Sequence, residues 1–400
     1  MSPAVREILD LVFRWLHVIA GIMWIGNSML WNWMDRNLEP SKEGTEGIQG
    51  EIWLLHSGAF YYVQKDARGW DRARPLHWFK WQAYTTWLSG AALLIVVYYL
   101  STGALLLDAS VSGLSHGAAV GIGVGVVIGG WILYDAVLAR ILDRAGAMGA
   151  VIGLLAVVGV AYGLVQVFSG RAAFLHVGAM LGTLMAGNVG HHIMPSQREL
   201  VGAVEAGRLP DPAYAKRAKS RSIHNNYITF PVIVLMLSSH FPGIYGHRLN
   251  WLLLGILALG GAAVRHILNV RFGWPRWKPA LAAAIAGTLA ALYLVGAPRA
   301  GADVEVDGGR PVSFGEVNAV IQKRCAACHS ASPADLTFGV APAGVAFDTP
   351  EQIRTRVERI RARAVETQTM PPANKTHITN EERALLGRWI AQGAPVDDPR

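Results

Sequence analysis

Eight long apolar stretches, separated by polar loops, fill the first three quarters of the chain. A helix of about 20 apolar residues crosses the ~30 Å hydrocarbon layer of a bilayer, and each stretch is close to that length. The stretches cover residues 8–34, 82–107, 117–139, 148–168, 172–194, 222–240, 250–268 and 280–297. This pattern predicts an all-α protein whose residues 1–297 form an eight-helix transmembrane bundle.

The C-terminal part has the pattern of a small soluble domain. Residues 298–312 are rich in Gly, Pro and acidic side chains and are expected to form a linker. In residues 313–400, three pairs have the spacing of a capping box, which opens a helix with a Ser or Thr and a Glu or Gln three residues later. The pairs are Ser313 with Glu316, Thr349 with Gln352, and Thr379 with Glu382. We therefore expect three helices in this domain.

Composition supports a membrane protein, because charged residues make up only 16% of the chain, against about a quarter in soluble proteins. The net charge of +8 does not indicate a nucleic-acid partner, since the basic residues gather in loops between apolar stretches. The second, fourth and sixth loops hold only Arg171 and Arg248, whereas the odd loops hold 18 lysines and arginines. By the positive-inside rule the odd loops are cytoplasmic. Both termini then lie on the outer side of the membrane, which for a bacterial inner membrane is the periplasm.

The only two cysteines, Cys325 and Cys328, are followed directly by His329. Cys-x-x-Cys-His is the attachment motif of c-type haem. Its spacing lets both thiols reach one edge of the porphyrin while the histidine ligates the iron. A thiol–disulfide switch or half a zinc site shares the Cys-x-x-Cys spacing, but zinc needs two more ligands at short spacing. We expect a covalent c-type haem in a small class I cytochrome c domain over residues 313–400.

Two residues after the motif could serve as the second axial ligand. Met370 is the only methionine in this part, and Pro371 and Pro372 follow it directly. A thioether ligand raises the haem potential relative to two histidines. We expect Met370 to ligate the iron and His377 to lie on the surface. Haem attachment takes place in the periplasm, which agrees with the charge pattern of the loops.

Ionisable residues in or beside the apolar stretches are functional candidates, because charge at membrane depth is costly. Candidates near the predicted cytoplasmic ends are His77, Asp135, His224 and His266. His17 and His176 lie nearer the periplasm, where facing histidines could ligate a b-type haem. For any one of these histidines, an inter-helix hydrogen bond is an equally good explanation. Of these and the neighbouring histidines, His191, His192 and His224, at helix ends, are the ones most expected to be merely interfacial.

The two halves of the membrane part are weakly similar in sequence. Matching pairs are His17 with His176, Asn27 with Asn188, His77 with His224, and Asp135 with His266. Two parallel four-helix halves would explain these pairs. Chance similarity between apolar segments would explain them too.

Two membrane segments, residues 15–27 (WLHVIAGIMWIGN) and 187–195 (GNVGHHIMP), and one segment of the first loop, residues 55–61 (LHSGAFY), resemble segments of a known family. With eight spans, a long first loop and a C-terminal cytochrome c, the whole chain resembles the membrane-bound urate hydroxylases, or urate oxidases. The resemblance implies two-electron oxidation of urate to 5-hydroxyisourate. The product oxygen would come from water and the electrons would pass to cytochrome c.

The implied reaction fits the candidate residues. Urate is an anion in the cytoplasm, and Arg72, Arg221 or Arg265 could hold it. The attacking water needs a base, for which His77, Asp135, His224 and His266 are the candidates. Electrons would pass outward by the His17 and His176 layer to the c-type haem. They would then reach a soluble cytochrome c or a terminal oxidase.

Other classes of protein fit parts of the pattern. A quinol–cytochrome c electron-transfer protein would use the same histidines with a quinol in place of urate. A transporter or sensor would use the cytochrome as a redox reporter. A haem–copper oxidase needs three histidine copper ligands in a spacing that the chain does not show.

Overall fold

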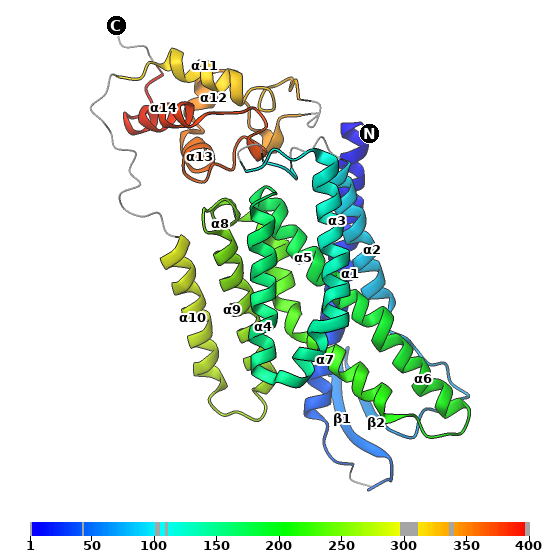
Figure 1. Ribbon diagram of the computed structural model, residues 1–400. Coiled ribbons are helices and arrows are strands. Elements are labelled where there is room, and N and C mark those ends of the chain that lie inside the picture. Colours follow the sequence, from blue (N-terminus) through cyan, green and yellow to red (C-terminus); the bar gives the residue numbers. More distant parts are fainter. Residues whose placement is uncertain are drawn as a thin grey trace.

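The computed structural model describes residues 2–41, 44–100, 105–108, 111–296, 311–335 and 340–396. The chain is mostly helical, as predicted. Long helices form the N-terminal part, and short helices form a C-terminal part at one end of this group (Figure 1). The predicted linker, residues 298–312, lies outside the described residues except for Pro311 and Val312.

The long helices are α1 (Pro3–Asn37), α2 (Trp81–Leu94), α3 (His116–Leu133), α4 (Ala139–Val165), α5 (Gly170–Gly187), α7 (Pro212–Leu237), α9 (Asn250–Val270) and α10 (Trp277–Gly296). Three of them continue into π-helical turns, which are η1 (Ile95–Tyr99), η2 (Tyr134–Leu138) and η3 (Asn188–Ile193). Shorter elements are α6 (Met194–Glu205), η4 (Ser238–His240) and α8 (Pro242–Tyr245).

Five helical stretches of the described residues are long and apolar enough to cross a membrane. They are Ala4–Asn37, His116–Val165, Gly170–Glu205, Asn250–Val270 and Trp277–Gly296. The predicted spans 82–107 and 222–240 are not among them, and the helices there, α2 with η1 and α7, both begin with a run of polar and aromatic residues. The membrane class is therefore confirmed, and the number of eight spans stays a prediction.

Helix α5 lies at the centre of the long helices and packs against α2, α3, α4 and α7. Most of its side chains are buried, as expected for a helix that is apolar all round. Its histidine, His176, is fully buried. Glycine at position 123 of α3 makes room for it, since a Cβ there would lie 2.7 Å from His176 Nε2 and 2.6 Å from the Tyr99 hydroxyl.

Helices α3 and α4 form one nearly continuous stretch that bends sharply at Gly146. This residue has φ 53° and ψ −123°, a conformation that side chains rarely adopt. The chain returns closely on itself there, because a Cβ at Gly149 would lie 2.9 Å from the Ile141 carbonyl oxygen. Glycine at both positions therefore permits the turn.

The first loop contains a β-hairpin of β1 (Ile48–His56) and β2 (Ala59–Asp66), so the prediction of an all-α fold was wrong here. Trp53 and Tyr62 pair across the strands, with ring centroids 4.7 Å apart. Ser57 and Gly58 both have positive φ, as two-residue hairpin turns require. A turn of this type between aromatic and aliphatic runs is the sequence signal that identifies a hairpin.

The C-terminal part consists of α11 (Phe314–Arg324), η5 (Pro342–Gly344), α12 (Pro350–Arg354), α13 (Val357–Ile360), η6 (Arg361–Glu366), η7 (Pro372–Asn374) and α14 (Asn380–Ala391). All three predicted capping boxes are present, at the starts of α11, α12 and α14. The core of this part includes Val317, Ile321, Leu386 and Trp389, all of them fully buried.

The C-terminal part meets the long helices beside α8, at the end opposite the hairpin (Figure 1). A Cβ at Gly246 would lie 2.6 Å from Thr369 Cγ2 and 2.8 Å from the Thr367 carbonyl oxygen. The segment just before Met370 therefore contacts the membrane part directly.

We expect Gly123→Ala to lower the stability of the protein by about 1–3 kcal/mol, because the new methyl group collides with the buried ring of His176. Gly125→Ala on the same helix is the matched control, since nothing lies within 4 Å of a Cβ there. Thermal unfolding of the detergent-solubilised protein measures both variants. Equal unfolding midpoints would contradict the close contact between α3 and α5.

Candidate functional site

Asp135, on η2, joins two other elements of the membrane part. Its Oδ1 accepts hydrogen bonds from His192 Nε2 at 2.5 Å and from Arg221 Nη2 at 3.1 Å. His192 lies on η3 and Arg221 on α7. A carboxylate can only accept, so His192 Nε2 carries the proton of this bond and the Nδ1 of the neutral ring keeps a lone pair. This is the arrangement of a carboxylate that orients a histidine base.

A second chain of hydrogen bonds leads from the same region to the surface. Asn188 Nδ2 donates to the Tyr134 hydroxyl at 2.8 Å, and this hydroxyl lies 2.8 Å from His224 Nδ1. His224 Nε2 lies 3.3 Å from Asp143, whose side chain is 43% exposed. Asn225 Oδ1 accepts the other Asn188 bond at 2.8 Å. The order of donors and acceptors suits transfer of a proton from Tyr134 towards solvent.

Four buried polar atoms near these contacts have no hydrogen-bond partner among the described residues. They are Trp131 Nε1, Asn188 Oδ1, His192 Nδ1 and Arg221 Nη1. Trp131 stands one helical turn before Asp135, and its ring lies 4.8 Å from that of His191. Buried polar groups are normally paired. Two hydrogen-bond donors and two acceptors in this region thus have no described partner. A polar ligand that both accepts and donates hydrogen bonds would satisfy them.

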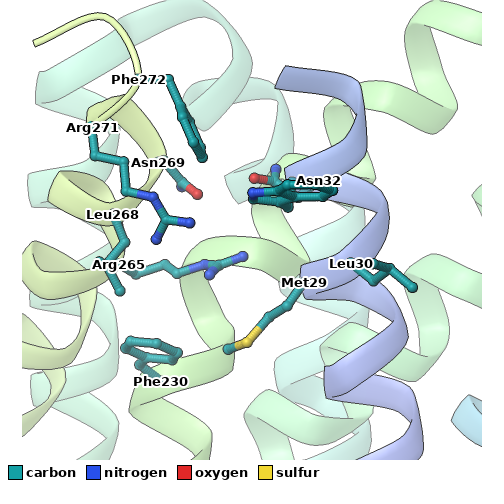
Figure 2. Close-up of a pocket in the computed structure, with 10 residues that line it drawn as sticks. Met29, Leu30, Asn32, Phe230, Arg265, Leu268, Asn269, Arg271 and Phe272 are labelled. Carbon is teal, nitrogen blue, oxygen red and sulfur yellow. The ribbon is translucent and has the colours of Figure 1, made fainter. Parts of the chain in front are cut away.

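A separate pocket of about 310 Å³ lies between α1, α7 and α9 (Figure 2). Arg265 is 6% exposed, and its Nε donates to Asn226 Oδ1 at 3.0 Å. Asn269 Nδ2 donates to the same oxygen at 2.7 Å. The Arg265 guanidinium also lies 5.5 Å from the Phe230 ring. No Asp, Glu or His is among the described residues that line this pocket.

The four predicted catalytic residues lie in three different places. Asp135 and His224 belong to the networks described above. His77 is exposed in the segment before α2. His266 is exposed on α9, where its Nδ1 lies 2.8 Å from the Tyr227 hydroxyl. Neither His77 nor His266 contacts Asp135 among the described contacts.

His17 and His176 lie on different packing surfaces. His17 Nδ1 donates to the Thr86 carbonyl on α2 at 2.8 Å. His176 Nδ1 donates to the Ala172 carbonyl at 2.8 Å, and its Nε2 lies 3.0 Å from the Tyr99 hydroxyl. Because both nitrogens of His176 are engaged, its surroundings do not fit a ligand of b-type haem.

The cysteine motif follows α11 directly. His329 Nδ1 donates to the Val345 carbonyl at 2.9 Å, which leaves Nε2 with its lone pair as a histidine ligand requires. Burial raises the pKa of the Cys325 thiol to about 12. Burial and the neighbouring Asp335 raise that of Cys328 to about 11. Both thiols and the histidine fit the covalent and axial attachment of a c-type haem.

Met370 is held by its backbone on both sides. Its amide donates to the Arg363 carbonyl at 2.9 Å, and its carbonyl accepts from Arg383 Nη1 at 2.9 Å. The Arg383 side chain is buried and also donates to the Ala364 carbonyl. His377 is exposed, in agreement with the predicted surface position. These bonds fix the backbone of Met370, and its role as the second axial ligand stays a prediction.

Comparison with known proteins bears on the membrane part. The sequence profile of a family described as urate oxidase N-terminal matches residues 3–296. The chain belongs to the urate oxidase N-terminal family. The predicted resemblance is thereby confirmed for α1 to α10, and it supports an oxidoreductase that acts on urate. No curated protein and no solved structure matches the chain.

Several residues of the Asp135 site were not predicted from the sequence, or were predicted differently. His192 was expected to be interfacial, and Trp131, Tyr134 and Asn188 were not candidates. The available signals were the repeat match of Asn188 with Asn27 and the family segment 187–195, which contains Asn188 and His192. The π-helical turns η2 and η3 decide which side chains meet, and such turns are frequent at functional sites. Among the described residues, no group of three or more His, Cys, Asp or Glu could hold a metal ion.

We expect iodoacetamide at pH 8 to alkylate Cys325 and Cys328 of the haem-free protein at least about tenfold more slowly than in the urea-unfolded chain. The thiolate is the reactive form, and an unfolded cysteine has a pKa of about 8.5. Raised pKa values keep both thiols protonated until the pH approaches about 11. Mass spectrometry follows the labelling, because the chain has only 2 cysteines. Equal rates in the folded and unfolded chains would contradict the burial of the motif.

Proposed function

We propose that the protein hydroxylates urate to 5-hydroxyisourate at the Asp135 site. The observation that carries the proposal is the His192 nitrogen, buried and unpaired, whose opposite nitrogen is held by Asp135. Membership of the urate oxidase family supplies the substrate class. In that setting, Asp135 and His192 form a base for the attacking water.

The leftover polar atoms of this site match the groups that urate carries. Urate is a planar anion with both carbonyl oxygens and ring N–H groups. Arg221 Nη1 and Trp131 Nε1 would donate to its oxygens, and Asn188 Oδ1 would accept from a ring N–H. Arg221 also attracts the anion, although Asp135 offsets part of its charge. The ligand would therefore be oriented through directional hydrogen bonds as well as charge.

The reaction balances as urate and water giving 5-hydroxyisourate, two protons and two electrons. Water forms the new C–O bond to the purine, and His192 Nδ1 accepts its proton. The chain from Tyr134 through His224 to Asp143 offers a route for a proton to solvent. His192 thus takes one proton from water. The second proton, from a ring N–H of the purine, would leave along the Tyr134 chain.

The electrons need an acceptor outside the Asp135 site. Cys325, Cys328, His329 and Met370 are proposed to hold a covalent c-type haem, which accepts one electron at a time when bound. The contact of Thr369 with Gly246 supports this role, because it brings the Met370 segment against the membrane part. A soluble cytochrome c or a terminal oxidase is the proposed final acceptor.

Anaerobic addition of urate to the purified protein tests the proposed activity. We expect the absorbance of reduced c-type haem to appear without added quinol, at two haems reduced per urate consumed. An alternative function, quinol–cytochrome c electron transfer, predicts reduction by a quinol and none by urate. That second result would reject urate as the substrate.

We expect His192→Gln to lower kcat by about 10²–10⁴-fold, the usual range for loss of a general base. KM should stay within about twofold, because Gln can still donate to Asp135. His77→Gln is the control, since His77 is exposed and outside the network. Steady-state rates with urate and cytochrome c measure both. A loss of activity in His77→Gln alone would place the base elsewhere.

A further inference from the structure

The pocket between α1 and α9 contains two cations without a negative partner. Arg265 is buried, and Arg271 follows the last residue of α9. Both guanidinium groups extend into the pocket between Phe230 and Phe272 (Figure 2). No carboxylate of the described residues forms an ion pair with either one. Cations at membrane depth need compensation, so the pocket requires an anion from outside the chain.

The walls of the pocket indicate what kind of anion this is. Met29, Leu30 and Leu268 supply an apolar surface. Leu30 is 47% exposed and Phe272 is 43% exposed, so the rim of the pocket faces the surface where acyl chains would lie. Trp33 stands near the end of α1, and tryptophan is enriched at membrane interfaces. A ligand with a charged head and an apolar tail fits these walls.

We propose that this pocket binds the phosphate group of an anionic phospholipid from the leaflet next to the hairpin. Guanidinium groups recognise phosphate oxygens through paired, charge-assisted hydrogen bonds. Basic pockets between transmembrane helices are known to hold such head groups. Arg271, at the end of α9, lies where the phosphate layer would be, and Met29 and Leu30 would contact the acyl chain.

Two other anions fit the pocket less well. Urate hydroxylation needs a proton acceptor, and the described lining residues include no Asp, Glu or His. Free phosphate would bind the arginines but would leave the apolar wall uncovered. The lipid is the ligand that uses both the charged and the apolar parts of the pocket.

Native mass spectrometry of the delipidated full-length protein, titrated with phosphatidylglycerol or phosphatidylcholine, tests the proposal. We expect one phosphatidylglycerol to bind more tightly than any phosphatidylcholine. Arg265→Gln and Arg271→Gln should each weaken it about fivefold, since each basic group contributes about 1 kcal/mol. Arg276→Gln is the matched control, because it removes an exposed arginine from the same loop. If Arg265→Gln fails to fold, the lipid affinity of Arg271→Gln still tests the pocket.

Three outcomes would overturn the proposal. Equal binding of the two lipids would remove the role of head-group charge. Unchanged phosphatidylglycerol affinity in Arg271→Gln would place the lipid elsewhere. Displacement of the lipid by urate, or equally tight binding of inorganic phosphate, would assign the pocket to a soluble anion. The titration with lipid needs no turnover, so its result is independent of the proposed activity.

Discussion

An arginine inside a helix bundle of a membrane must find negative charge or hydrogen-bond acceptors, because water cannot solvate it there. The two arginines buried in the membrane part meet this requirement in different ways. Arg221 has Asp135 at 3.1 Å, and the same carboxylate oxygen orients His192. Arg265 donates to the Asn226 amide oxygen and lies over the Phe230 ring, and none of the described carboxylates pairs with it. One arginine is thus part of a closed network, whereas the other faces an open pocket.

Helix α7 separates these two environments. Asn225 and Asn226 are consecutive, so their side chains point about 100° apart around the helix axis. Asn225 accepts from Asn188 on the side of α5. Asn226 accepts from Arg265 and Asn269 on the side of α9. Because both asparagines are buried and hydrogen-bonded, a movement of α7 would change the geometry of the Asp135 site and of the lipid pocket together.

The C-terminal part holds the two proposed haem ligands, His329 and Met370, through backbone hydrogen bonds. Arg383 donates to the Met370 carbonyl, and Val345 holds the ring of His329. Arg324 pairs with Glu382 through both carboxylate oxygens. Burial opposes ionisation of Glu382, but this pair and the Thr379 amide lower its pKa on balance. The capping glutamate of α14 therefore also fastens α11, the helix that leads into Cys325.

The sequence by itself determined the membrane class and the capping boxes, because these depend on local periodicity and spacing. It also indicated the family, through the likeness of particular segments to those of its members. Its all-α prediction missed the hairpin, whose Ser57–Gly58 turn was the neglected local signal. Only the tertiary structure decided which polar residues meet. Asp135 pairs with His192 and not with His77, and this depends on how α3, α5 and α7 pack and on π-helical turns that shift the register of side chains. Apolar periodicity says that a helix is buried, but it does not say against which neighbour.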